Sequence, residues 1–160
     1  MINKSFLISI LFTLIFVPIL SAQDISFTGK WKTIDDKTGK EKSIVVISLD
    51  ENGNLTGQIE KVFRNPDEDQ NPVCDKCEGD KKNAPLVGMQ ILWGFAQENK
   101  KNEHVWNSGK ILDPKTGTIY GCNMTLDESG KKIQVRGFVG ISLIGRTQTW
   151  VRIEEEIEEK

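Results

Sequence analysis

Residues 118–126 read TIYGCNMTL, and the alternation in this segment decides the predicted fold. One face carries the larger, mostly apolar side chains of Tyr120, Cys122, Met124 and Leu126. Small or polar residues lie between them. Because successive side chains of a β-strand point to opposite faces of the sheet, this period of two predicts a strand. It also predicts that Cys122 faces the core.

Seven further segments are rich in β-branched and aromatic residues, and most are bounded by glycine-containing turns. The predicted strands are residues 28–33, 43–49, 55–63, 90–97, 104–112, 118–126, 132–139 and 147–153. Within residues 55–63, a period of two places Ile59 and Phe63 on one face. The sequence therefore predicts an all-β protein with one small antiparallel up-and-down barrel of about eight strands, and a β-sandwich is the alternative.

The N-terminal residues have the pattern of a secretory signal peptide. Lys4 precedes a mostly apolar run at residues 6–20, and the small residues Ser21 and Ala22 follow. The run is short for a membrane span, which needs ~20 apolar residues. We therefore expect residues 1–22 to be a signal peptide that is cleaved after Ala22, with an uncleaved membrane anchor as the alternative.

The predicted cleavage leaves a single barrel domain at residues 23–153 and an acidic C-terminal tail at residues 154–160. We expect an exported protein, either periplasmic or secreted, whose mature chain has no transmembrane segment. The net charge of −2 comes from well-mixed acidic and basic residues. Nucleic-acid binding is not expected, because it requires a basic patch or stripe.

The longest predicted loop, residues 64–85, is acidic and contains the pair Cys74 and Cys77. We predict a disulfide between these two cysteines that pins the loop, with Cys122 left as a buried free thiol. A bridge from Cys122 to either loop cysteine is the alternative, since spacing alone does not fix connectivity. Thiol–disulfide exchange is disfavoured, because the flanks suit neither a helix nor a lowered thiol pKa.

Two metal sites are weaker hypotheses for the same loop. A tetrahedral zinc site would use every cysteine and the only histidine, namely Cys74, Cys77, Cys122 and His104. A calcium site would use the ligand ladder Asp67, Asp69, Asn71, Asp75 and Glu78. Pro72 stands where such a calcium loop needs glycine for its sharp turn. We prefer no metal and predict no cofactor.

Catalytic patterns are sparse in this chain. There is no glycine-rich phosphate loop, and no serine or thiol is marked as the partner of His104. We assign no catalytic residues and regard an enzyme as the less favoured reading. A hydrolase or isomerase that uses His104 with an acid remains the enzymatic hypothesis.

The motif at residues 29–31, GKW, opens the first predicted strand, and Arg152 lies in the last. This placement resembles lipocalin-like barrels, in which a late arginine packs over the tryptophan of a G-x-W motif. The resemblance implies that Arg152 stacks on Trp31 and closes one end of the barrel. Arg146 is an alternative packing partner.

The chain as a whole resembles a family of exported bacterial proteins known as domain of unknown function 2147. The blocks that carry this resemblance are residues 29–31, 55–59, 74–77, 109–114 with Gly117 and Tyr120, 136–140 and 145–150. The resemblance implies a small β-barrel and export. It implies no activity and transfers no catalytic residues.

Two functions compete. The first is a binding module that holds a small apolar molecule or a peptide in the barrel mouth, beneath the loop at residues 64–85. Its candidate lining residues are Trp93, Phe95, Tyr120 and Met124. The second is an envelope structural or protein-interaction module that would use the same loop and the tail at residues 154–160.

Overall fold

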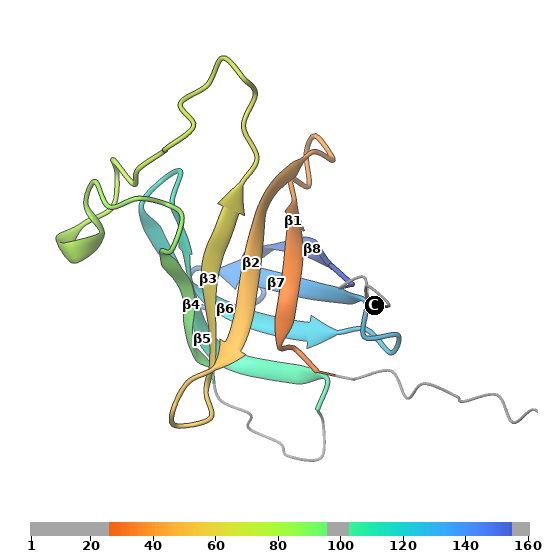
Figure 1. Ribbon diagram of the computed structural model, residues 1–160. Helices are drawn as coiled ribbons and strands as arrows, with labels where there is room; N and C mark the ends of the chain where they lie inside the picture. Colours follow the sequence, from red (N-terminus) through yellow and green to blue (C-terminus); the bar gives the residue numbers. More distant parts are fainter. Residues whose placement is uncertain (1–25, 96–102, 155–160) are drawn as a thin grey trace, which may run out of the picture.

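The computed structural model describes residues 26–95 and 103–154, which form an eight-stranded closed antiparallel barrel (Figure 1). The strands are β1 (Gly29–Ile34), β2 (Glu41–Leu49), β3 (Leu55–Val62), β4 (Gln90–Phe95), β5 (Val105–Asp113), β6 (Thr118–Leu126), β7 (Lys132–Phe138) and β8 (Gly145–Arg152). Each strand pairs with the next, and β8 pairs with β1 to close the sheet. The predicted fold class is confirmed, and the sandwich alternative is excluded.

Several boundaries fall outside the described residues. These are the predicted signal peptide with its cleavage point after Ala22, the end of the strand predicted at residues 90–97, and most of the predicted acidic tail. Among residues 26–95 and 103–154, no helix has the length and apolar character that crossing a membrane requires.

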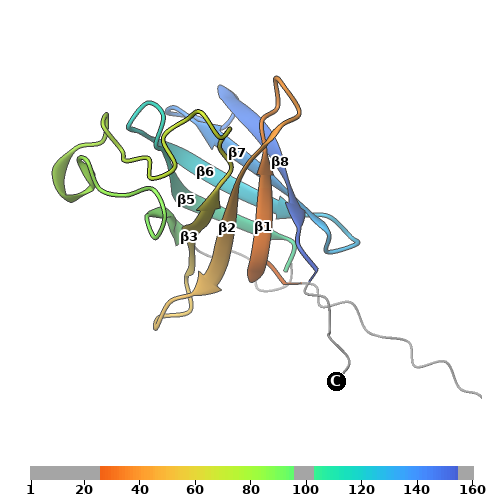
Figure 2. The same cartoon turned by 45° about the horizontal axis from the view of Figure 1, so that its top comes forward.

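The up-and-down topology gives the barrel two distinct ends. The turns β1–β2, β5–β6 and β7–β8, together with the long β3–β4 connection, lie at the upper end (Figures 1 and 2). The turns β2–β3 and β6–β7 lie at the lower end, together with the residues that precede β1. The side chains on and near the turns of each end therefore determine whether that end of the barrel is closed or open.

A β-bulge in β3 corrects one prediction about which residues face inward. Val45 pairs with Ile59, but the preceding residue Ile44 pairs with Lys61, so β3 carries one extra residue at this point. A bulge of one residue inverts the alternation beyond it. Val62 packs against the core as a result, whereas Phe63 lies under the Lys61 ammonium, 5.1 Å from the ring centroid. Ile59 and Phe63 do not share the inner face.

The long β3–β4 connection packs against the outside of the barrel. Leu92 of β4 pairs with Ile111 of β5, so their neighbours Ile91 and Leu112 point to the outer face. Both are nevertheless buried. They are covered by residues 72–89, which we call the clasp, and whose Cys74, Cys77 and Met89 belong to the same buried cluster. The clasp therefore builds a small second core on the outer wall.

Candidate functional site

The lower end of the barrel is closed by Arg152 and Trp31. The Arg152 guanidinium lies over the Trp31 ring, 4.3 Å from its centroid. It also donates hydrogen bonds to the carbonyl oxygens of Gly130 (2.6 Å), Thr28 (2.9 Å) and Ser26. The indole Nε1 of Trp31 donates to the carbonyl oxygen of Phe27 at 2.8 Å. One side chain thus ties three chain segments together across this end.

Gly29 explains why the motif begins with glycine. Its backbone has φ +121°, which residues with a side chain rarely adopt. A Cβ at this position would also meet Nη1 of Arg152 at 3.0 Å. The glycine therefore leaves room for the guanidinium that covers Trp31.

The interior above this closure is filled by side chains that are shielded from solvent. Each of them is at most 2% exposed, and they are Trp31, Val45, Ile47, Leu55, Leu92, Phe95, Cys122, Met124, Ile133, Val135 and Trp150. Phe95 packs so closely on β5 that a Cβ at Gly109 would meet its ring at 2.3 Å. This part of the barrel is a packed core.

The inward-facing positions nearer the upper end have a different character. The inward-facing residues that the strand register places there include Thr33, Ser43, Ile111, Tyr120, Gly137 and Gln148. All are partly exposed except Thr33. Thr33 and Ser43 share a hydrogen bond between their hydroxyls at 2.8 Å, and the amide oxygen of Gln148 accepts a bond from Trp150 Nε1 at 3.4 Å. We call this ring the mouth layer.

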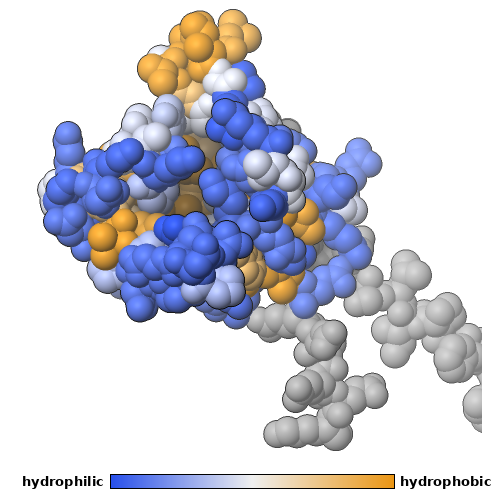
Figure 3. Space-filling view, turned by 90° about the horizontal axis from the view of Figure 1, so that it is seen from above, coloured by the Kyte–Doolittle hydropathy of each residue, from blue (hydrophilic) through white to orange (hydrophobic). Residues whose placement is uncertain are grey.

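Gly137 leaves a recess in the mouth layer. A Cβ built on it would lie 3.6 Å from Ile111 Cγ2 and 3.7 Å from Tyr120 Cβ, which are ordinary van der Waals distances. Glycine therefore leaves unfilled space beside an aliphatic and an aromatic side chain. Figure 3 looks onto the upper end and shows a hollow with apolar atoms at its bottom.

The β7–β8 hairpin adds an apolar edge to this end. Val139, Ile141, Leu143 and Ile144 are all highly exposed, and they form the apolar protrusion at the edge of Figure 3. Arg146, at the base of the hairpin, forms an ion pair with Asp36 of the β1–β2 turn. The upper end thus combines a recessed polar and apolar floor with an apolar edge.

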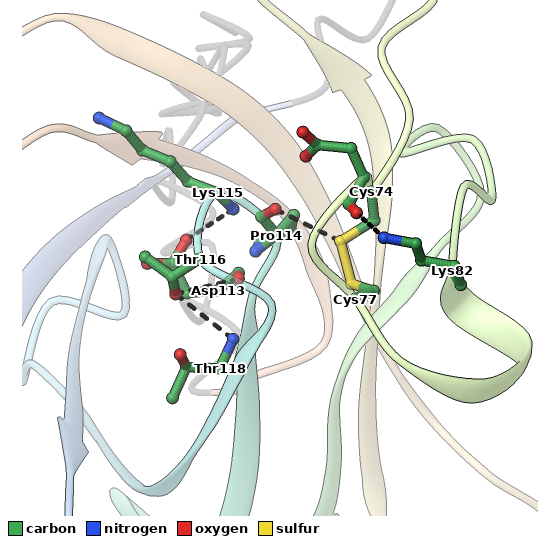
Figure 4. Close-up of a disulfide and its surroundings, with 9 residues drawn as sticks. Cys74, Cys77, Lys82, Asp113, Pro114, Lys115, Thr116 and Thr118 are labelled. Carbon is green, nitrogen blue, oxygen red and sulfur yellow. Dashed lines mark hydrogen bonds between the residues drawn. A yellow bond between two sulfur atoms is a disulfide. The ribbon is translucent and has the colours of Figure 1, made fainter.

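The clasp is held by a disulfide between Cys74 and Cys77, with Cα atoms 5.3 Å apart. The backbone around it forms a narrow ladder, in which Cys74 N donates to Ala84 O and Asn83 N donates to Cys74 O, each at 2.9 Å. The Lys82 ammonium donates to the carbonyl oxygen of Asp75 (Figure 4). The predicted disulfide is present, and Cys122 is a buried free thiol.

The disulfide end of the clasp docks on the β5–β6 turn (Figure 4). The Cys74 sulfur lies 3.3 Å from the carbonyl oxygen of Pro114. A Cβ at Gly117 would lie 2.0 Å from the carbonyl oxygen of Lys76, and Gly117 has φ +72°. Only glycine satisfies both the backbone conformation and this close approach. The clasp therefore lies beside the mouth, and not above it as the binding hypothesis expected.

The chain matches, over residues 29–152, the family described as "Uncharacterized protein conserved in bacteria (DUF2147)". It belongs to this family. The match begins at the glycine of the GKW motif and ends at Arg152, so it spans the whole closed barrel. No match was found among curated proteins.

The DUF2147 barrel of this chain is similar to a solved structure whose title reads "Protein HP1028 from the human pathogen Helicobacter pylori belongs to the lipocalin family". The TM-score is 0.65, with 18% sequence identity, and the likeness covers 81% of this chain and 84% of that one. At this level of identity the likeness concerns the fold. This chain therefore has a lipocalin-like barrel.

The DUF2147 barrel separates the four predicted lining residues. Tyr120 belongs to the mouth layer. Phe95 and Met124 are fully buried in the packed core. Trp93 pairs with the exposed Lys110, which places it on the outer face. Strict alternation would place Trp93 and Phe95, two positions apart, on the same face. The irregularity around Gly94, which has φ +71°, breaks the alternation, so the two side chains lie on opposite faces.

The candidate metal ligands are not brought together. Within residues 26–95 and 103–154, no group of three or more histidine, cysteine or acidic side chains has metal-binding geometry. The disulfide engages two of the three thiols proposed for zinc. Burial raises the pKa of the third, Cys122, to about 12, so it stays protonated at neutral pH. In the proposed calcium ladder, Asp69 instead accepts a hydrogen bond from the Asn71 backbone at 2.9 Å.

His104 lies at the lower end, away from the mouth layer. Its Nδ1 is 3.2 Å from the carbonyl oxygen of Leu126, next to the β6–β7 turn. The histidine and the recess at Gly137 therefore do not form one site.

The mouth-layer residues that sequence reasoning missed are Thr33, Ser43, Ile111, Gly137 and Gln148. Their signal was weak, because the sequence shows which strand positions share a face but not which of them lie near an open end. The exposed apolar hairpin carried a clearer signal, since residues 139–144 place aliphatic side chains inside a turn.

Proposed function

We propose that this protein is an exported binding protein that holds a small apolar or amphipathic molecule in the mouth layer of its barrel. The observation that carries the proposal is the recess at Gly137 beside Ile111 and Tyr120. It is the place where the barrel interior is both partly exposed and underfilled. Small-molecule sites are concave, mostly apolar and supplied with a few polar groups.

The polar groups of the mouth layer would set the orientation of the ligand. The Thr33 and Ser43 hydroxyls and the Tyr120 phenol can donate or accept hydrogen bonds. An amphipathic molecule would place its apolar part against Ile111 and its polar part among these hydroxyls. The lipocalin-like fold supports this reading, because small closed barrels can hold one small ligand.

We further propose that the protein works in the periplasm or outside the cell. The Cys74–Cys77 disulfide supports this location, since disulfides persist in oxidising compartments. The pattern of Lys4, the apolar run at residues 6–20 and the small residues after it supports it independently. Reading the N-terminus of the exported protein by intact mass tests cleavage after Ala22.

Filling the recess tests the binding proposal. Gly137→Ala adds one methyl group at ordinary contact distance, whereas Gly137→Leu extends into the mouth layer. We expect the wild-type protein to take up the apolar fluorophore N-phenyl-1-naphthylamine. We expect Gly137→Leu to weaken uptake by at least about tenfold, because a Leu-sized volume of the site is lost. Gly137→Ala, the matched control, should stay within about twofold.

Native mass spectrometry of the exported protein completes this test. A retained adduct that Gly137→Leu abolishes would support the mouth layer as the site. Absence of both an adduct and fluorophore uptake in the wild type would overturn the proposal. Equal uptake by both Gly137 variants, each with an unchanged thermal midpoint, would also overturn it.

A second candidate function is protein contact through the clasp. A groove of about 400 Å³ lies between the clasp and the β5–β6 turn, lined by Lys76, Cys77, Glu78, Lys81, Leu112, Thr116, Gly117, Thr118 and Ile119. Ile119 is exposed there, and lysine and glutamate side chains border it. Ile119→Lys should abolish crosslinking to an envelope partner in the native host. Unchanged crosslinks would remove this candidate.

A further inference from the structure

The apolar end of the β7–β8 hairpin is the most exposed aliphatic surface among the described residues. Val139, Ile141, Leu143 and Ile144, which we call the tip, are 66%, 59%, 84% and 70% exposed. Scattered apolar residues on a surface need no explanation, but four within six residues form a contiguous patch. The tip is convex and protrudes from the molecule (Figure 3).

The tip is held in this exposed arrangement by Arg136. The guanidinium donates to the carbonyl oxygens of Ser142 (2.7 Å) and Leu143 (3.2 Å), and to the hydroxyl of Thr147 (3.0 Å). The backbone closes the turn through Val139 N to Ile144 O at 3.3 Å. These bonds hold the backbone of the turn, and the four aliphatic side chains are exposed in this arrangement.

Basic side chains lie at the base of the hairpin and on the neighbouring β1–β2 turn. Arg146 pairs with Asp36 and so joins the hairpin to the β1–β2 turn. Asp35 is engaged within that turn, where its carboxylate accepts bonds from Thr38 and pairs with Lys42. Among residues 26–95 and 103–154, Lys37 and Lys40 make no ion pair.

The charge count over this surface is opposite to that of the whole chain. Residues 35–40 and 136–146 contain four basic and two acidic side chains, which gives a net charge of +2. The whole chain has a net charge of −2. Such a surface is complementary to a membrane with anionic lipids. Its aliphatic side chains match the apolar interior, and its positive charge matches the anionic headgroups above that interior.

The size and shape of the tip distinguish between possible partners. A stable protein–protein interface buries about 800 Å² on each partner. Four aliphatic side chains on a turn expose only a few hundred Å². A convex tip of this size is too small to carry a stable interface with a second copy. It is sufficient for an interfacial contact in which apolar side chains enter the headgroup boundary by about 5–10 Å.

We infer that the tip docks on the surface of an anionic phospholipid membrane, with its four aliphatic side chains inserted and with Lys37 and Lys40 at the headgroups. This goes beyond ligand binding and does not require it. It has one geometric consequence, because the tip borders the upper end. Docking would turn the mouth layer toward the membrane.

Vesicle flotation tests this inference. The probe is the exported protein with vesicles of phosphatidylethanolamine alone or with 25% phosphatidylglycerol, roughly one anionic lipid in four. We expect the wild type to float with the anionic vesicles at low salt. Ile141→Ser/Leu143→Ser should weaken binding by more than about tenfold, because two inserted side chains are lost. Lys37→Gln/Lys40→Gln should weaken it by about tenfold and remove most of its salt dependence.

The matched control is Leu49→Ser/Val87→Ser, which removes two exposed aliphatic side chains elsewhere. It should float like the wild type. All variants have the same N-terminus, so any difference in flotation between them comes from the substituted side chains. No flotation of the wild type, or equal flotation of the wild type and the tip variant, would overturn the inference. A wild-type dimer that the tip variant converts to a monomer would overturn it in favour of self-association. Fluorophore uptake is scored separately, so failure of membrane docking and failure of ligand binding remain distinguishable.

Discussion

The two ends of the barrel are built from the same eight strands but differ in how they are closed. At the lower end, Arg152 covers Trp31 and bonds to three backbone carbonyls, and the core above it is shielded from solvent. At the upper end, the inward positions are mostly half-exposed, Gly137 leaves a recess, and the hairpin presents aliphatic residues to solvent. The difference indicates that the lower end contributes more to stability than the upper end does.

Replacing Trp31 should have the largest effect. Trp31→Ala removes a fully buried indole and its hydrogen bond to Phe27, so we expect the free energy of unfolding to fall by about 3–5 kcal/mol. The matched variant at the upper end, Tyr120→Ala, should cost less than about 1.5 kcal/mol, because this side chain is only partly buried. Urea unfolding measures both. Equal losses at the two ends would contradict the proposed division.

Arg152→Met should cost somewhat less, about 2–3 kcal/mol, because it leaves carbonyl acceptors unpaired and removes the contact with the Trp31 ring. The matched variant is Arg146→Met, which breaks an exposed ion pair with Asp36 and should cost about 1 kcal/mol or less. Thermal unfolding of both variants ranks the two arginines. A larger loss for Arg146→Met would show that the upper end is the principal closure.

Removing the disulfide should have a moderate effect that is confined to the clasp. Cys74→Ser/Cys77→Ser abolishes a short covalent loop, which in the chain-entropy model contributes about 2 kcal/mol. Because the barrel closes without the clasp, limited proteolysis should cleave residues 72–89 first and leave the barrel intact. Simultaneous loss of the barrel would mean that the outer core and the inner core unfold as one unit.

The smallest expected effect is an acid-induced loosening of the upper rim. Hydrogen bonds from the backbone and hydroxyl of Thr38 lower the pKa of Asp35 to about 2. A carboxyl whose pKa is lower in the folded state stabilises that state above its unfolded pKa of about 4. This contribution is lost as the pH falls from about 4 to about 2. Asp35→Asn should flatten the dependence of the thermal midpoint in this window, and an unchanged slope would contradict the prediction.

Local chemistry was sufficient to predict the strands. The alternation at residues 118–126 matches β6, and the glycine-containing turns separate strands close to their observed bounds. The disulfide was also predicted, since two cysteines three positions apart in an irregular loop can form a short bridge and their flanks disfavour thiol–disulfide exchange. These features depend on neighbours in the chain, and the sequence records such neighbours directly.

The candidate site was less predictable, because it depends on bulges and on which end of each strand is covered. Because β3 carries an extra residue, Val62 and not Phe63 lies on the inner face. The irregular end of β4 places Trp93 on the outer face. Phe95 and Met124 do face inward, but they lie where the barrel is filled. Only Tyr120 among the predicted lining residues reached the mouth layer.

The sequence by itself determined the antiparallel strands and the turns between them, because period-two alternation and turn chemistry are local properties of the chain. The tertiary structure decided that the clasp lies on the outer wall and that its disulfide end packs against Gly117. It also decided that one end is sealed while the other is recessed. These outcomes depend on contacts between residues far apart in the chain, such as Arg152 with Ser26 and Gly137 with Ile111. Closure of the sheet sets such contacts, and no local pattern encodes them.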